Sequence, residues 1–104
     1  MKQIVNGKRY DTDTAEKIAV DSYSNHRDFQ YWSEEIYRTK RGNWFLAGEG
    51  GALSKYARSV GQNEIGGGSA IIPLTRGKAL AWLEAHTTNS KVYEKYFTDM
   101  LEDA

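Results

Sequence analysis

This 104-residue chain has no cysteine, a single proline and no excess of charge of either sign. The lack of cysteine excludes disulfides, thiolate zinc sites and thiol nucleophiles, and because it fits a reducing compartment we expect the cytoplasm. Fourteen Lys and Arg residues balance fourteen Asp and Glu residues, so no overall field draws the protein onto nucleic acid or a membrane. No segment approaches the roughly 20 apolar residues of a membrane span, and the N-terminus has no run like that of a signal peptide.

The length suits one domain with one core, and we expect residues 1–104 to form it. Three Trp, seven Tyr and three Phe are many for a hydrophilic chain. Large rings close a small core with few side chains, so most of these aromatic residues are expected inside. The rest are available for an exposed patch that contacts a protein partner or bases.

Turn signals predict a hairpin at the start of the chain. Asn6-Gly7 is the dipeptide that best tolerates the two positive φ angles of a type I′ turn. Asp13 and Glu16 then have the spacing of a capping box, which predicts a helix over 13–23.

A second hairpin is predicted from strands over 31–39 and 44–47, where aromatic and β-branched residues are enriched. Its tip, Lys40-Arg41-Gly42-Asn43, is basic. A helical spacing of apolar residues from Leu53 to Val60 follows. Residues 62–69 are predicted to form a mobile loop.

The C-terminal part is predicted to begin with a buried strand over 70–72 that stops at Pro73. Thr75 suits the N-cap of a helix that runs to about 87. A last helix starts at Asn89 or Ser90 and carries an apolar stripe expected to dock on the core or on a second copy: Val92, Tyr93, Tyr96, Phe97, Met100 and Leu101. The fold class is therefore α+β, a small antiparallel sheet of two hairpins and a short strand packed by about four helices, in the order ββαββαβαα.

A glycine cluster after the second hairpin is the strongest candidate site. Because Gly48, Gly50 and Gly51 stand between a predicted strand and a predicted helix, Gly50 or Gly51 is predicted to have φ > 0. Such a turn brings backbone N–H groups close to a ligand. The spacing matches neither a Walker motif nor a dinucleotide fingerprint, and Glu49 would place an acid inside an anion site.

Five cations form a second candidate surface. Arg38, Lys40 and Arg41 belong to the tip of the second hairpin, and Lys55 and Arg58 lie on the next predicted helix. If they share one side of the fold, they can track phosphates without reading bases.

No catalytic set is recognisable. His26 and His86 lie in different elements, and neither has the neighbours of a triad or a metal site. Glu34 and Glu35 alternate along a strand, so they face opposite sides of the sheet and cannot act as an acid/base pair. We therefore expect no enzymatic activity, no metal and no cofactor.

Several segments together resemble a family of small bacterial proteins that are common on phages and other mobile elements. They cover nearly the whole chain: Asn6 to Ala15, Glu35 to Lys40, Trp44 to Gly51, Ser54 to Ala57, Ile72 to Leu74, and Trp82 to Glu84. The resemblance brings no catalytic residues with it. Small proteins of mobile elements often bind a host component, and in size and composition this chain is similar to anti-CRISPR proteins.

From this resemblance we expect a non-enzymatic interaction protein, an anti-CRISPR inhibitor that binds a host defence effector. Its partner is then a host protein or ribonucleoprotein, while its own oligomeric state, including a homodimer, stays open. The surface expected to bind the partner combines the second hairpin and the glycine cluster: Arg38, Lys40, Arg41, Trp44, Glu49, Gly50, Gly51, Ser54, Lys55 and Arg58. The alternatives are a nucleic-acid-binding accessory domain that uses the basic hairpin tip, and a small-ligand binder at the glycine cluster.

Overall fold

A computed structural model describes all 104 residues as eight strands, two α-helices and a final 3₁₀ turn. The strands are β1 (Lys2–Val5), β2 (Lys8–Asp11), β3 (Glu16–Tyr23), β4 (Trp32–Arg38), β5 (Trp44–Gly50), β6 (Arg58–Gly61), β7 (Glu64–Gly66) and β8 (Gly68–Leu74). The helices are α1 (Arg76–His86), α2 (Ser90–Tyr96) and the 3₁₀ turn η1 (Thr98–Met100).

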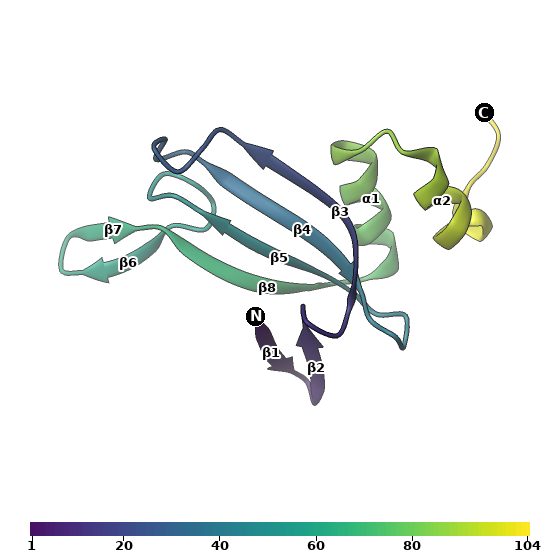
Figure 1. Cartoon of the computed structure of the whole chain (residues 1–104), viewed down its shortest axis with the longest axis horizontal. Coiled ribbons are helices and arrows are strands. Elements are labelled where there is room, and N and C mark those ends of the chain that lie inside the picture. The colour runs from purple at the N-terminus through teal and green to yellow at the C-terminus, as the bar shows by residue number, and fades with distance from the viewer.

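The centre of the molecule is an antiparallel sheet in the order β3-β4-β5-β8, and two further hairpins, β1-β2 and β6-β7, project from it (Figure 1). The α+β class with small antiparallel sheets is thus confirmed. The expected number and order of elements is wrong, because two of the four predicted helices are absent. Neither remaining helix is long and apolar enough to cross a bilayer.

The helix predicted over 13–23 is instead a turn followed by β3. Asp13, the predicted cap of that helix, donates its backbone N–H to the carboxylate of Asp11 at 2.9 Å. This hydrogen bond stabilises a turn rather than a helix start. Residues 16–23 then form β3 because they pair with β4, with a bulge between Lys17 and Ala19.

Both predicted hairpins are confirmed. Asn6 and Gly7 have φ angles of 51° and 77°, as a type I′ turn requires. In the second hairpin the N–H of Thr39 donates to the carbonyl oxygen of Asn43 at 2.8 Å, and Gly42 supplies a φ of 86°. β5 continues past the predicted end at residue 47 to Gly50.

The helix predicted from Leu53 to Val60 is also wrong, since the chain forms a loop there and then β6. Residues 62–69, predicted to be a mobile loop, contain a tight turn with Asn63 at φ 60°, then β7 and the start of β8. Pro73 lies inside β8 rather than ending it. An edge strand tolerates proline because one side of its backbone has no ladder partner.

The two C-terminal helices agree with the sequence. The Thr75 hydroxyl accepts a hydrogen bond from the N–H of Lys78 at 3.1 Å, so Thr75 is the N-cap of α1. The apolar stripe of the last helix docks on the core mainly through Phe97, which is fully buried, whereas Met100 and Leu101 are exposed.

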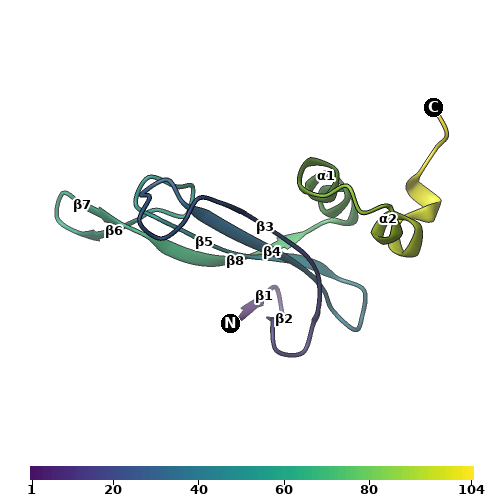
Figure 2. The same ribbon diagram turned by 45° about the horizontal axis from the view of Figure 1, so that its top comes forward.

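The core consists of two clusters on opposite faces of the sheet. The helices cover one face and the β1-β2 hairpin lies against the other, as Figure 2 shows. The helix-side cluster is Ile36, Trp44, Leu46, Ala79, Trp82, Leu83 and Phe97. The hairpin-side cluster is Tyr10, Tyr37, Phe45 and Ile71.

Candidate functional site

The sequence-predicted site residues divide between the two ends of the sheet. Arg38 is paired with Trp44 at one end of the β4-β5 ladder, and Trp32 is paired with Gly50 at the other. Six residue steps at about 3.3 Å each separate these pairs by about 20 Å. The five predicted cations therefore do not form one cluster, because Lys55 and Arg58 follow the far end.

A basic groove forms at the near end, between the turn of the β1-β2 hairpin and the turn of the β4-β5 hairpin. It encloses about 420 Å³ and is lined by Lys8, Arg9, Lys40 and Arg41, together with mainly polar and glycine residues. Sequence reasoning missed Lys8 and Arg9. A signal was present, since Asn6-Gly7-Lys8-Arg9 and Lys40-Arg41-Gly42-Asn43 contain the same four residue types in a different order.

The four cations of the basic groove have no ionic partner within the chain. Every ion pair of the protein involves other Lys, Arg or His residues. The one acid that lines the groove is Asp11, and one oxygen of its carboxylate is engaged by the Asp13 N–H. These four cations can therefore bind anionic groups of a partner without first breaking an internal salt bridge.

Arg38 and Trp44, both predicted to bind a partner, have structural roles. The Arg38 guanidinium lies over the ring of Tyr96 at 5.1 Å from its centroid. Trp44 is buried and packs against Phe97 with ring centroids 5.1 Å apart. Trp44 is therefore corrected from a partner contact to a core residue.

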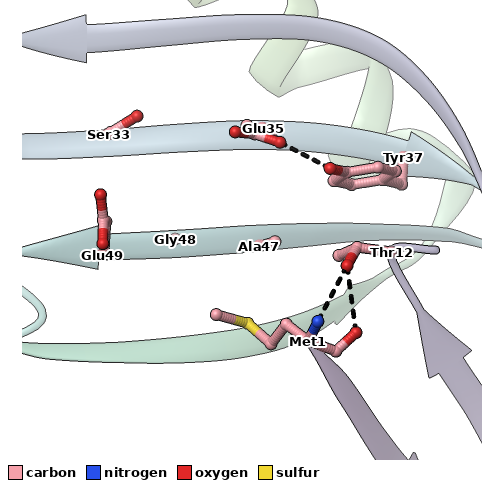
Figure 3. A pocket seen from close by; sticks show the side chains of 8 residues that line it. All are labelled: Met1, Thr12, Ser33, Glu35, Tyr37, Ala47, Gly48 and Glu49. Atoms are coloured by element: carbon pink, nitrogen blue, oxygen red, sulfur yellow. Dashed lines mark hydrogen bonds between the residues drawn. The ribbon is translucent and has the colours of Figure 1, made fainter.

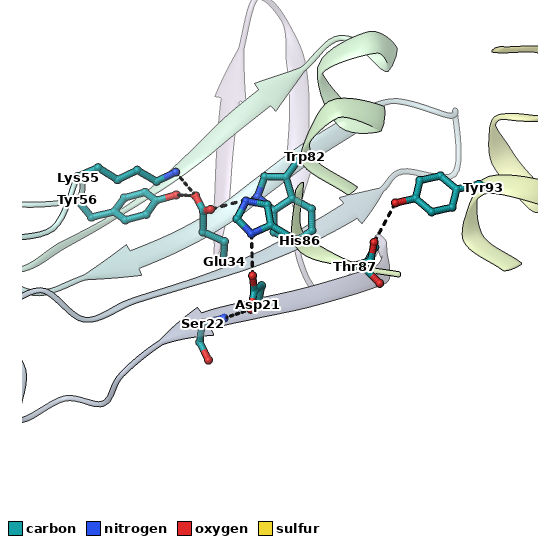
Figure 4. A network of polar contacts seen from close by, with 9 residues as sticks. All are labelled: Asp21, Ser22, Glu34, Lys55, Tyr56, Trp82, His86, Thr87 and Tyr93. Carbon is teal, nitrogen blue, oxygen red and sulfur yellow. Dashed lines mark hydrogen bonds and ion pairs between the residues drawn. The ribbon is translucent and has the colours of Figure 1, made fainter. Parts of the chain in front are cut away.

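At the far end of the sheet, Glu34 is buried on the helix side and is held by three donors (Figure 4). The Lys55 ammonium lies 2.6 Å from Oε2 of Glu34, and the Tyr56 hydroxyl donates to the same oxygen. Trp82 Nε1 donates to Oε1 at 3.1 Å. We call this the Glu34 network; it joins β4, the loop between β5 and β6 (residues 51–57) and α1.

Burial by itself raises the pKa of Glu34, but the hydrogen bonds from Lys55, Tyr56 and Trp82 outweigh it and hold the pKa below its usual value. Glu34 is therefore ionised at neutral pH. Burial and the bond to Glu34 raise the pKa of the Tyr56 phenol, which keeps its proton and stays a donor. The network is consequently fully satisfied in one protonation state, and no buried side-chain polar atom of the protein lacks a partner.

The glycine cluster is needed for close packing, not for positive φ. The prediction that Gly50 or Gly51 has φ > 0 is wrong, because Gly7 and Gly42 are the glycines with that geometry. A Cβ on Gly51 would lie 2.5 Å from the carbonyl oxygen of Phe29, and a Cβ on Gly50 would overlap the hydroxyl of Ser54. These glycines thus allow two loops to pack against the strand end.

Three further residues of the predicted surface lie around this loop. Ser54 donates to the carbonyl oxygen of Gly51 at 2.7 Å, which fixes the loop. Arg58 donates to the carbonyl oxygen of Ser69 and so ties β6 to β8. Glu49 is exposed and accepts a hydrogen bond from the Tyr31 hydroxyl at 2.5 Å.

Glu34 and Glu35 do face opposite sides of the sheet, as predicted. Glu35 lies on the hairpin side, where it accepts from Tyr37 at 2.5 Å and pairs with Lys17 at 3.3 Å. Figure 3 shows it with Glu49 around a cavity of about 260 Å³ that the N-terminus borders.

Asp21 and His86 form a pair that sequence reasoning missed. Nδ1 of His86 lies 2.7 Å from Oδ2 of Asp21, and the hydrogen bond to His86 is the main reason that the pKa of Asp21 is lowered. The imidazole also stacks on Trp82 at a centroid distance of 4.3 Å. No signal in the sequence joins these residues, because the helix predicted over 13–23 placed Asp21 outside the sheet.

His26, the other histidine, packs against Tyr31 in the β3-β4 loop with ring centroids 4.4 Å apart. No three His, Cys, Asp or Glu side chains come together as a metal site. Comparison with protein-family models, curated proteins and solved structures finds no match to this chain.

Proposed function

We propose that this chain is a non-enzymatic interaction protein that binds an anionic surface of a host protein or ribonucleoprotein through the basic groove. In this proposal the protein serves a mobile genetic element and inhibits a host defence effector, such as a CRISPR effector, by occupying that surface. The observation that carries the proposal is the convergence of Lys8, Arg9, Lys40 and Arg41 from two separate turns, with no acid paired to them.

The groove supports this role in two ways. Its cations sit on the turn of the β4-β5 hairpin and at the start of β2, next to turns in which Asn6, Gly7 and Gly42 adopt the positive φ that the turns need. Less ordering is therefore required on binding than for charges on a flexible tail. Two of the cations are arginines, whose planar guanidinium can bind a carboxylate or a phosphate through two hydrogen bonds.

The same groove makes nucleic-acid binding the second candidate function. Four unpaired cations suffice to follow a phosphate backbone, and the groove contains no aromatic side chain other than the buried Tyr10 for reading bases. Binding would then be independent of sequence. It would also weaken with salt, with a slope of log K against log salt of about −3.6 for four contacts on duplex DNA.

The decisive experiment compares two double charge reversals in a pull-down from the native host. Lys40→Glu with Arg41→Glu removes half of the groove's charge, and Lys78→Glu with Lys91→Glu makes the same change of net charge at exposed residues of the helices. We expect the groove variant to lose the partner and the helix variant to keep it. Equal capture by both variants would contradict the proposal.

Nuclease treatment of the captured material separates the two candidate functions. A protein partner that survives complete nuclease digestion supports binding to a host effector. Loss of all captured material on digestion, with the steep salt dependence above, supports the nucleic-acid alternative instead.

A further inference from the structure

A second cavity, of about 500 Å³, lies on the helix side of the sheet at the end opposite the basic groove. Its walls come from β3, β4 and the loop between them, from the loop between β5 and β6, and from the last residue of α1. The aromatic and apolar part of the wall is Tyr23, Trp32 and Leu53, of which Tyr23 and Leu53 are largely exposed. The polar part includes Gln30, Lys55 and His86.

His86 presents a free ring nitrogen to solvent at this cavity. Its Nδ1 is taken by Asp21, and Nε2 has no hydrogen-bond partner in the chain. No buried side-chain nitrogen lacks a partner, so Nε2 must be accessible. Because the Asp21 carboxylate can only accept a hydrogen bond from Nδ1–H, Nε2 of the neutral imidazole carries a lone pair and acts as an acceptor.

Lys55 supplies hydrogen-bond donors to the cavity. Its ammonium has three N–H donors, and Glu34 is its one carboxylate partner in the chain. The side chain is 59% exposed, so its other donors are available on the cavity side. Gln30 adds one amide that can both donate and accept.

No charge at this cavity is left without a partner. The Lys55 ammonium is balanced by the buried Glu34 carboxylate, and the Asp21 carboxylate, which does not line the cavity, accepts a hydrogen bond from Nδ1–H of His86. An ion gains little from such a wall, while a neutral ligand with donors and acceptors around its rim can use every group. Trp32 and Tyr23 supply ring surfaces suited to stacking with a flat ligand.

We propose that this cavity binds one uncharged heteroaromatic ring of nucleobase size, stacked against Trp32 or Tyr23 and hydrogen-bonded at its rim to Lys55, His86 and Gln30. The chemistry of recognition is the same for a free base and for a base presented by a single strand, and the probes below distinguish the two. This site is separate from the basic groove, and it does not depend on the function proposed there.

Tryptophan fluorescence tests the proposal directly, because Trp44 and Trp82 are buried and Trp32 is the tryptophan that lines the cavity. The probes are adenosine, guanosine, cytidine and thymidine, and an oligothymidylate of about ten nucleotides, a typical site size for single-strand binding. We expect saturable quenching with a dissociation constant below about 1 mM. Quenching must disappear in Trp32→Phe.

Two exposed apolar residues of adjoining loops give a matched pair of variants. Leu53 is 66% exposed and lines the cavity, whereas Phe29 is 68% exposed and does not. Leu53→Ala, and separately Gln30→Ala, should weaken binding at least threefold, while Phe29→Ala leaves it unchanged. A change in the His86 imidazole resonances on addition of the probe provides a second readout.

The outcomes are distinct. Nucleoside binding identifies a free base as sufficient, and binding of the oligonucleotide alone identifies a base presented by a strand. Absence of saturable quenching by every probe, or equal binding by wild type and Leu53→Ala, overturns the proposal. So does binding of N-acetyltyrosinamide without any nucleoside, which would assign the cavity to an aromatic side chain of a protein partner.

Discussion

Gly48 lies directly beneath the phenol of Tyr56, so close that a Cβ on Gly48 would overlap the Tyr56 hydroxyl oxygen. Gly48 is also the cross-strand partner of Glu34. The missing side chain on β5 therefore opens the space through which Tyr56 reaches the buried carboxylate. The hydrogen bond from Tyr56 to Glu34 therefore depends on glycine at position 48.

Gly48→Ala should destabilise the fold by about 2 to 4 kcal/mol, because it displaces Tyr56 and leaves Glu34 short of one donor. Gly77→Ala is the matched control. Gly77 lies in α1, where a Cβ meets nothing within 4 Å, so alanine should stabilise by up to about 1 kcal/mol. Urea unfolding of both variants measures the difference. A Gly48→Ala variant as stable as wild type would contradict the packing described above.

Stability should depend on pH through Glu34. The pKa of Glu34 is lowered on folding from a reference value of 4.5, so its contribution is present above that pH and is lost as the pH falls through the lower folded-state value. Asp21, whose pKa is lowered from 3.8, adds a loss of the same sign at lower pH. Glu34→Gln should flatten the fall of the unfolding free energy between pH 5 and the acid limit, as measured by denaturant titrations at several pH values. An unchanged pH profile in this variant would show that another group carries the dependence.

Lys55→Met should cost about 1 to 3 kcal/mol, because Glu34 would remain buried without its cation. Lys78→Met is the control, since Lys78 is exposed and makes no ion pair. It should change the unfolding free energy by no more than about 0.5 kcal/mol. Equal effects of the two substitutions would mean that the ion pair with Glu34 adds nothing to stability.

Phe97→Ala should cost about 3 to 5 kcal/mol, because the ring is fully buried between Trp44 and the helices. Met100→Ala is the control and should change the unfolding free energy little, because Met100 is exposed. Thermal unfolding of both variants checks this. A small effect of Phe97→Ala would show that the C-terminal segment docks only weakly on the sheet.

Burial, and then the hydrogen bond to Glu49, raise the pKa of Tyr31 to about 12. Glu49→Gln should bring this pKa down, while leaving it above 10 because the burial remains. An NMR titration of the Tyr31 ring carbon measures it. No change in Glu49→Gln would place the cause of the shift in burial alone.

The sequence predicted the elements whose signals are local. Asn6-Gly7 and Thr75 fix a turn and a helix start through their own backbone geometry and hydrogen bonds, and both occur where predicted. The segments 13–23 and 53–60 were mispredicted because their apolar spacing is ambiguous at short length. Pairing with β4, which is remote in the sequence, makes a strand of most of the first segment, whereas the second is a loop up to residue 57 followed by β6, which pairs with β7.

The site residues, too, were predictable from the sequence where the signal was local and not where it depended on long-range packing. The basic tip at Lys40-Arg41 was visible in the sequence, but its neighbours Lys8 and Arg9 depend on how the first hairpin packs. The Glu34 network joins residues separated by 21 and 48 positions in the chain, with Lys55 and Trp82 at its ends. Only the register of β4 against β5 and the placement of α1 reveal it.

The two edges of the central sheet carry different irregularities, the bulge between Lys17 and Ala19 in β3 and the proline in β8. Each interrupts the regular row of N–H and C=O groups that an added strand would need. Both edges of the central sheet thus carry a feature that disfavours the addition of a further strand.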